Sequence, residues 1–240
     1  MLVLNKVSLP ISLQLSGLPP KQKKRNFKNL ALCGPSSENA LPYALPSAAP
    51  QWLKPQQKTY SNGPKEILEN LYLGDEMNAS DPDVLKKYNI GFILNVAKEV
   101  DNSLVDFACS SHWQTVSDEK VCLQLKKHTF STSSEESHSV YSKKLFWDHN
   151  QDNIQEFFAA SFNFINLARS LGVGVLIHCQ CGVSRSASLM IGYVMQANNL
   201  SFESAYQHVK SKSSVVSPNL SLIAQLLEFE NGRSSLNIIS

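Results

Sequence analysis

A cysteine and an arginine six positions apart carry the clearest chemical signal in the sequence. Cys179 lies two positions after a short apolar run at residues 173–177, and Arg185 begins an apolar stretch with the character of a helix. A buried strand that turns into a helix N-terminus directs backbone N–H groups and the helix dipole toward one point, which suits an anion. A cysteine there is expected to be a thiolate, and the guanidinium can bind two oxygens of that anion at once. Gly182 lets the backbone turn closely around that anion.

The run from His178 to Ser186 is His-Cys-Gln-Cys-Gly-Val-Ser-Arg-Ser. It resembles the signature loop of the cysteine-dependent protein phosphatases and, among them, of the dual-specificity phosphatases. Within that family it is most similar to the fungal MAP-kinase phosphatases. Three further segments look like the first strand, the second strand and the last helix of the family, at residues 67–74, 93–97 and 217–230.

The resemblance implies a role for each position of this loop. Cys179 would form a phosphocysteine, Arg185 would bind the phosphate, and Ser186 would bond the sulfur and assist phosphate release. His178 would order the loop through its imidazole. The remaining positions would bind phosphate through the loop: Gln180, Cys181, Gly182, Val183 and Ser184. The chemistry implied needs no cofactor and no metal, and the scattered histidines show no metal-ligand spacing with cysteine.

A thiolate that displaces an alkoxide or phenoxide needs an acid to protonate the leaving group. The family places an aspartate upstream of the cysteine, on a loop after a short strand. Asp148 directly follows the apolar residues 145–147 and fits that place. Asp152 is the alternative acid; we favour Asp148 and expect Asp152 to cap the helix that begins near Ile154.

Beyond Pro64, short apolar runs alternate with helical patterns, which indicates an α/β domain. The resemblance implies a central mixed sheet flanked by helices. Strands are predicted at residues 71–74, 91–96, 145–147 and 173–177. Helices are predicted from Pro82 to about Lys87, from Ile154 to a stop at Gly172, and at 184–198, 202–212 and 218–230. Residues 101–140 show no firm period, so we expect a long loop with at most one strand, longer than in compact family members.

The charge is unevenly distributed along the 240 residues. Residues 1–63 carry eight Lys or Arg and one acidic residue, together with eight of the eleven prolines, whereas residues 64–240 carry 14 basic and 19 acidic residues. A basic, proline-rich segment with few apolar faces does not readily order itself. We therefore expect a disordered, flexible arm at residues 1–63, the catalytic domain at 64–232 and a short tail at 233–240.

The arm contains a basic cluster followed by Leu-x-Leu, which resembles the docking motif of MAP-kinase partners. Basic residues would meet an acidic patch and leucines a hydrophobic groove. The residues concerned are Lys23, Lys24, Arg25, Leu30 and Leu32. A nuclear-import signal, a solvated charge run and an organelle-targeting sequence are the alternatives, and the sequence does not choose among them.

Cys181 lies two residues from the predicted nucleophile. A second thiol could resolve an oxidised Cys179, with Cys33 or Cys109 as further partners. The alternative is a small residue that fills a position of the loop. The five cysteines lack the spacing of a disulfide framework, which indicates a reducing, intracellular setting.

Together these features predict a cytoplasmic dual-specificity phosphatase, with the nucleus as a further location, that acts on phosphotyrosine and on phosphothreonine or phosphoserine. The favoured substrate is a MAP kinase; neither a nucleic acid nor a membrane is expected as a partner. The loop has no lysine, which disfavours phosphoinositide and RNA substrates. A catalytically weak phosphate-binding module and a phosphatase for a non-protein substrate remain as alternatives.

Overall fold

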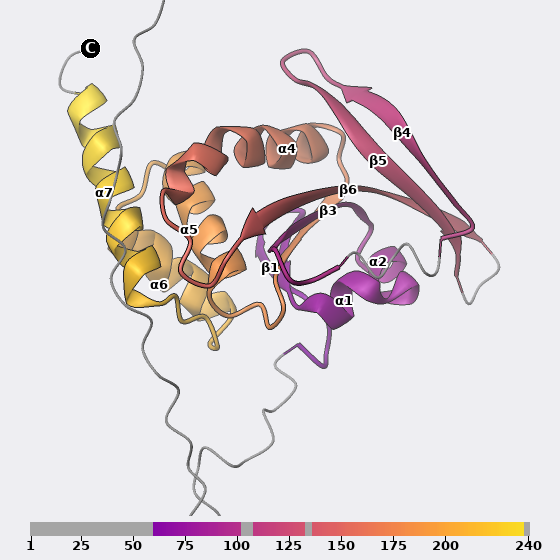
Figure 1. Ribbon diagram of the computed structural model, residues 1–240, viewed down its shortest axis with the longest axis horizontal. Helices are drawn as coiled ribbons and strands as arrows, with labels where there is room; N and C mark the ends of the chain where they lie inside the picture. The colour runs from indigo at the N-terminus through magenta and orange to yellow at the C-terminus, as the bar shows by residue number, and fades with distance from the viewer. Residues whose placement is uncertain (1–59, 102–107, 133–135, 238–240) are drawn as a thin grey trace, which may run out of the picture. The chain divides into compact units, whose positions relative to one another are not determined.

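The computed structural model of the chain describes residues 60–101, 108–132 and 136–237 (Figure 1). They build a seven-stranded sheet with the order β1-β2-β7-β3-β6-β5-β4. The strands are β1 (Lys65–Leu68), β2 (Leu71–Gly74), β3 (Ile90–Ala97), β4 (Ser110–Ser117), β5 (Cys122–Ser131), β6 (Ser137–Trp147) and β7 (Gly174–His178). The neighbours β2, β7, β3 and β6 run parallel, while β1, β5 and β4 are antiparallel to their neighbours. The predicted α/β fold with a mixed sheet flanked by helices is confirmed.

Helices cover both faces of this sheet (Figure 1). They are α1 (Glu76–Ser80), α2 (Pro82–Lys87), the 3-10 helix η2 (Ile154–Phe157), α4 (Phe158–Ser170), α5 (Arg185–Ala197), α6 (Phe202–Lys212) and α7 (Leu220–Asn237). Successive side chains of a strand point to opposite faces. Accordingly, Ile93 and Leu176 pack with α1 and α2, whereas Phe92 and Val175 belong to the larger core that includes α4, α5, α6 and α7.

Local sequence signals set several helix ends as predicted. The carboxylate of Asp81 accepts hydrogen bonds from the N–H groups of Asp83 and Val84 at 3.0 and 3.2 Å, and Pro82 occupies the first turn of α2. Gly172 follows α4 with a φ of 70°, a left-handed conformation that glycine adopts without strain. The last helix continues to Asn237, so the predicted start of the tail at residue 233 lies too early in the chain.

The segment 101–140 differs most from its prediction as a long loop. It forms the β4–β5 hairpin and the beginning of β6. All residues of β4 except Val116 are exposed, so the strand shows no alternation of apolar and polar residues. Its order comes from pairing with β5 along its whole length, from Ser110 opposite Thr129 to Ser117 opposite Cys122. Such pairing leaves no mark in the hydrophobic pattern.

The folded domain also begins earlier than the predicted boundary at residue 64. Tyr60 is only 1% exposed and belongs to the main core. The N–H of Gly63 donates to the carbonyl of Tyr60 at 2.9 Å, closing a turn into β1. Residues 60–63 are therefore part of the domain, and the rest of the predicted arm lies outside the described residues. Within the described part of the chain, no helix is long and apolar enough to cross a membrane.

Candidate active site

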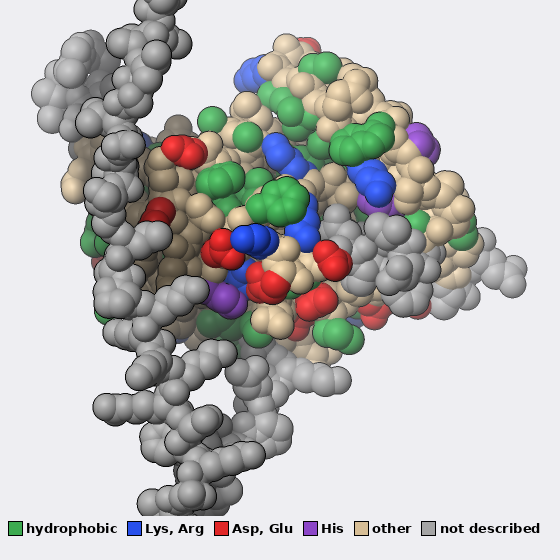
Figure 2. All heavy atoms as spheres, viewed as in Figure 1, with side chains coloured by type: hydrophobic (Ala, Val, Ile, Leu, Met, Phe, Trp, Pro, Cys, Tyr) green, Lys and Arg blue, Asp and Glu red, His purple; other side chains and the backbone are tan. Residues whose placement is uncertain are grey.

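Three parallel strands bring the candidate residues to one edge of the sheet. β3 and β6 are parallel, with Ala97 opposite Trp147, and β3 and β7 are parallel, with Asn95 opposite His178. The segments that follow these strands therefore emerge together, and ligands of such sheets bind outside the carboxyl ends of the strands. Acidic, basic and histidine side chains gather near the end of β6 on the face seen in Figure 2.

The loop between β7 and α5 turns its carbonyl groups outward. The carbonyl of Gln180 accepts from the N–H of Glu76 at 3.3 Å, and that of Val183 accepts from the N–H of Ser217 at 2.9 Å. The carbonyl of Gly182 accepts from the hydroxyl of Tyr60 at 2.9 Å. Among the described residues, none accepts a hydrogen bond from the N–H groups of residues 180–184. N–H donors without partners at a helix N-terminus are suited to an anion.

Gly182 is required where the loop approaches Tyr60 most closely. Its φ is 70°, and a Cβ on it would lie 2.5 Å from the carbonyl oxygen of Gly74 and collide with the Tyr60 ring. Burial raises the pKa of Tyr60 to about 12 and outweighs the opposing effect of its hydrogen bond to Ser213. Tyr60 is therefore a neutral hydroxyl donor at any ordinary pH, and it stabilises the loop through its contact with Gly182.

Cys179 lies at the start of the loop and is 3% exposed. The Ser186 hydroxyl donates to Cys179 Sγ at 3.2 Å, which is the contact that the resemblance implied. His178 is also buried, and burial lowers the pKa of its imidazole to about 4. Its Nδ1 lies 3.3 Å from the carbonyl oxygen of Cys179, to which it must donate. His178 is therefore neutral near pH 7 and braces the backbone beside the sulfur.

Arg185 is buried at the first position of α5 and forms a bidentate ion pair with Glu99. Its Nη1 donates to Glu99 and, at 3.1 Å, to the carbonyl of Trp147, while its Nη2 donates to the second Glu99 oxygen. A guanidinium has five N–H donors. Three are used in these bonds, which leaves Nε–H and one Nη2–H on the side suited to a bidentate phosphate. Glu99 thus fixes the orientation of the Arg185 guanidinium and leaves its Nε–H and Nη2–H edge free.

The hydrogen bonds from Arg185 lower the pKa of Glu99 to about 2, against an opposing effect of partial burial. Because the folded-state pKa lies below the ordinary value of 4.5, ionised Glu99 stabilises the fold above about pH 4.5. That stabilisation is lost as the pH falls through about 2. The Glu99 side chain is 40% exposed, so solvent screens part of the effect.

Glu99→Gln is expected to lower kcat/KM for a phosphate monoester about tenfold, mainly by raising KM. The amide keeps the size of the side chain but cannot hold the guanidinium with two charged contacts. The Arg185 guanidinium is then no longer held in one orientation. Steady-state kinetics measure the effect, and Glu119→Gln in the exposed β4–β5 turn is the matched control. Unchanged kinetics for Glu99→Gln would show that Arg185 is held adequately by Trp147 and the surrounding core.

Asp148 directly follows β6 and lies next to Trp147, whose carbonyl binds Arg185. Its side chain is 66% exposed and pairs with Lys98 Nζ at 3.2 Å. The backbone N–H of Lys98 in turn donates to the carbonyl of Trp147 at 3.1 Å. Two adjacent residues that follow β3 therefore contact two candidate site residues. Lys98 contacts Asp148, and Glu99 contacts Arg185.

Asp152 does not cap the following helix, and the expectation that it would is wrong. The residue at the cap of η2 is Asn153, in a left-handed conformation with a φ of 54° and no side-chain cap bond. The N–H of Ile154 is bonded instead by Gln225 Oε1 of α7, at 2.8 Å. Asp152 is exposed, and its carboxylate has no partner among the described residues.

Sequence reasoning missed Tyr60, Lys98 and Glu99. A signal for the latter two was present, because a Lys-Glu pair directly follows the buried strand at residues 90–97, at the edge where a parallel sheet binds ligands. Tyr60 had no such signal, since it lies at the end of a proline-rich segment. The predicted docking residues Lys23, Lys24, Arg25, Leu30 and Leu32 lie outside the described residues.

Cys181 is exposed on the loop, and its pKa is raised, first by partial burial and then by the negative charges of Cys179 and Asp75. Cys109 and Cys122 are exposed free thiols, and Cys33 lies outside the described residues. A protonated thiol attacks an oxidised sulfur poorly. We therefore expect Cys181→Ser to recover from peroxide treatment with added thiol as fast as the unaltered protein. A slower recovery of activity in this variant would support a resolving role for Cys181.

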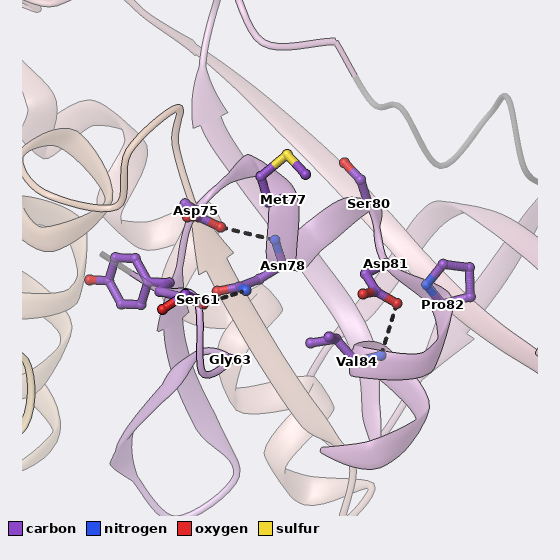
Figure 3. Close-up of a pocket in the computed structure, with 10 residues that line it drawn as sticks. Ser61, Gly63, Asp75, Met77, Asn78, Ser80, Asp81, Pro82 and Val84 are labelled. Atoms are coloured by element: carbon purple, nitrogen blue, oxygen red, sulfur yellow. Dashed lines mark hydrogen bonds between the residues drawn. The ribbon is translucent and has the colours of Figure 1, made fainter. Parts of the chain in front are cut away.

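A cavity of about 480 Å³ lies between residues 60–63 and the helices α1 and α2 (Figure 3). Tyr60 and Asp75 form part of its wall, and Asp75 caps α1 by accepting from the N–H of Asn78 at 2.9 Å. The carboxylates of Asp75 and Asp81 line the cavity, with no Lys or Arg among the lining residues. This acidic lining does not suit a phosphate ligand. Within the described ranges, no cluster of three or more His, Cys, Asp or Glu is arranged to hold a metal ion.

Comparisons with known proteins agree with this geometry. The chain is 33% identical over 216 residues to dual specificity protein phosphatase 7 of Rattus norvegicus, covering 90% of this chain and 44% of the relative. It is 34% identical over 176 residues to dual specificity protein phosphatase 6 of Homo sapiens, covering 73% and 39%. The chain thus spans less than half the length of either relative.

The fold is similar to that of human DUSP28, with a TM-score of 0.53 and 17% identity, covering 71% of this chain and 95% of that chain. The family model described as "Dual specificity phosphatase, catalytic domain" matches residues 71–232. This match contains the loop 178–186 as well as Glu99 and Asp148. The chain belongs to the dual specificity phosphatase catalytic-domain family.

Proposed function

We propose that this chain hydrolyses phosphotyrosine and phosphothreonine or phosphoserine in proteins through a phosphocysteine intermediate. The observation that carries the proposal is the arrangement around Cys179 Sγ. It combines a serine hydroxyl at 3.2 Å, a loop of N–H groups without partners among the described residues, and an arginine whose remaining donors are free. This set of groups serves a nucleophile and the oxygens of a phosphate dianion.

In the first step the Cys179 thiolate attacks phosphorus, and the bond from phosphorus to the leaving oxygen breaks. Asp148 donates its proton to that oxygen, so that an alcohol or phenol departs and a phosphocysteine remains. In the second step Asp148, now a carboxylate, takes a proton from water while the water oxygen attacks phosphorus. The S–P bond breaks, the thiolate is regenerated with the Ser186 hydroxyl as its hydrogen-bond donor, and inorganic phosphate leaves.

The substrate we favour is a MAP kinase phosphorylated on threonine and tyrosine. Two features of the sequence support this choice: the likeness of the loop to fungal MAP-kinase phosphatases, and the basic cluster with Leu-x-Leu at residues 21–32. A kinase with an acidic patch beside a hydrophobic groove would accept that motif. We propose a cytoplasmic location, with the nucleus as a further location, which imaging of a fluorescent fusion would test.

The experiment is phosphate release from a peptide that carries both phosphothreonine and phosphotyrosine, measured with a chelator present. We expect release of both phosphates at a rate that the chelator does not change. Release from phosphotyrosine alone would contradict dual specificity but keep the chemistry. No release by folded protein from either residue would favour a phosphate-binding module or a non-protein substrate.

A further inference from the structure

The β4–β5 hairpin separates from β6 and leaves a fork between β5 and β6. β5 pairs with β4 from Cys122 to Thr129, but with β6 only from Lys126 to Ser131. Beyond Lys126 the two strands diverge, and the hairpin splays away from β6 (Figure 1). In the fork, the β6-facing edge of β5 and the β5-facing edge of β6 have no strand partner among the described residues. Unpaired strand edges can bind an extended peptide.

The fork is held open by packing on α4. The Ser170 hydroxyl of α4 donates to the carboxylate of Asp118 in the hairpin turn at 2.6 Å. Val116 and Leu125 of the hairpin are buried in the main core. The separation of the hairpin from β6 is therefore built into the fold.

Aromatic and basic side chains line this fork around a cavity of about 390 Å³. Trp113 is 70% exposed and Phe146 is 64% exposed, and both line the cavity. Lys126, Lys143 and Lys144 line it as well, with no acidic residue among the lining residues. Hydrophobic and basic side chains lie together over β6 and the hairpin in Figure 2. Exposed aromatic rings beside a cluster of basic side chains are typical of a binding surface rather than of a solvated face.

The three lysines differ in whether their ammonium groups already have partners. Lys144 pairs with Asp101 at 3.3 Å, and the Lys143 ammonium donates to the carbonyl of Ala160 at 3.3 Å. Lys126 has no ion-pair partner in the described part of the chain. Lys126 is therefore the residue most able to attract an anionic group.

The fork leads to the active site along one face of β6. Alternate side chains of a strand share a face, so Ser142, Lys144 and Phe146 lie in a row that points toward Asp148. Ser142 pairs with Lys126, which in turn pairs with Trp113. Six residues of extended chain span about 20 Å. An extended polypeptide that follows β6 from Asp148 to Ser142 would therefore need about six residues.

We propose that this fork binds an extended acidic segment of the phosphorylated protein substrate, with one apolar side chain against Trp113 and Phe146. The inference rests on the proposed function, since it names a second region of that same substrate. The lysines select acidic residues, the aromatic rings bury the apolar one, and the open strand edges hydrogen-bond its backbone.

The test compares two phosphotyrosine peptides with eight-residue extensions on either side, one containing Asp, Glu and one Leu, the other the matching Asn, Gln and Leu. We expect the acidic peptide to show a kcat/KM about 5- to 10-fold higher, mostly through KM. Lys126→Glu should abolish this preference. Lys127→Glu makes the same charge change on the opposite face of β5, where the Lys127 ammonium lies over the Tyr141 ring, and should keep the preference. Neither variant should change hydrolysis of a small aryl phosphate.

A second measurement distinguishes a failure of the fork proposal from a failure of the proposed catalytic function. Fluorescence anisotropy with the Cys179→Ser protein reports binding of both peptides without turnover, and Trp113→Ala should weaken binding while Trp113→Phe retains most of it. Equal binding and equal kcat/KM for the two peptides, or equal losses in the two lysine variants, would overturn the fork proposal. Tighter binding of single-stranded nucleic acid than of the acidic peptide would overturn it as well. If the unaltered protein does not hydrolyse the aryl phosphate, that result would contradict the proposed function instead.

Discussion

Cys179→Ser is expected to lower kcat for phosphate ester hydrolysis by at least about 10⁴-fold while the protein still binds phosphorylated substrate. The loss follows from the nucleophile itself, because a serine hydroxyl in this loop has no base to deprotonate it. Ser186 is placed to donate to the sulfur and His178 is neutral and bonded to the backbone, so neither can act as that base.

The measurement is a single-turnover assay with an aryl phosphate, combined with binding of a phosphotyrosine peptide to the variant. Cys122→Ser, which changes an exposed free cysteine on β5, is the matched control and should retain full activity. Residual turnover within tenfold of the unaltered protein would mean that another group attacks phosphorus, and the phosphocysteine mechanism would then be wrong.

Asp148→Asn is expected to lower kcat by about 10²- to 10³-fold for phenyl phosphate and by much less for a substrate whose leaving group is stable as an anion. The difference arises because only a poor leaving group needs the proton. Measuring kcat with both substrates at one fixed pH tests the prediction.

Asp152→Asn provides the matched control for this prediction. Asp152 is the other acid that the sequence offered, and it lies on the same connection between β6 and η2. Its substitution should change kcat less than twofold. If Asp152→Asn shows the large effect and Asp148→Asn does not, the loop must rearrange when substrate binds, and the roles of the two residues are reversed.

The catalytic loop could be predicted from the sequence because its chemistry is local. A strand, a glycine with positive φ, an arginine and a helix start occur within thirteen consecutive residues, from Gly174 to Ser186. The contacts of Arg185 could not be predicted in the same way. Its partners Glu99 and Trp147 are 86 and 38 residues away, and only the pairing of β3 with β6 and β7 brings them together.

The hairpin shows the opposite limit of sequence analysis. Residues 110–117 lack an apolar face, so the pattern that identifies a half-buried strand is absent, although the backbone pairs fully with β5. In β3 and β7, by contrast, continuous burial gives short apolar runs that the sequence reveals directly. The hydrophobic pattern therefore predicted the centre of the sheet and missed its outer edge.

The hydroxyl of Tyr60 has a practical consequence for anyone who shortens this protein. A recombinant version that starts at Pro64 would keep every residue of the phosphatase loop and yet lose the ring that packs behind Gly182. The vacated space would expose the carbonyl of Gly182 and leave Ser213 without its partner. Such a truncation would be less active for reasons unrelated to docking, so the contribution of the arm should be measured with deletions that end before Tyr60.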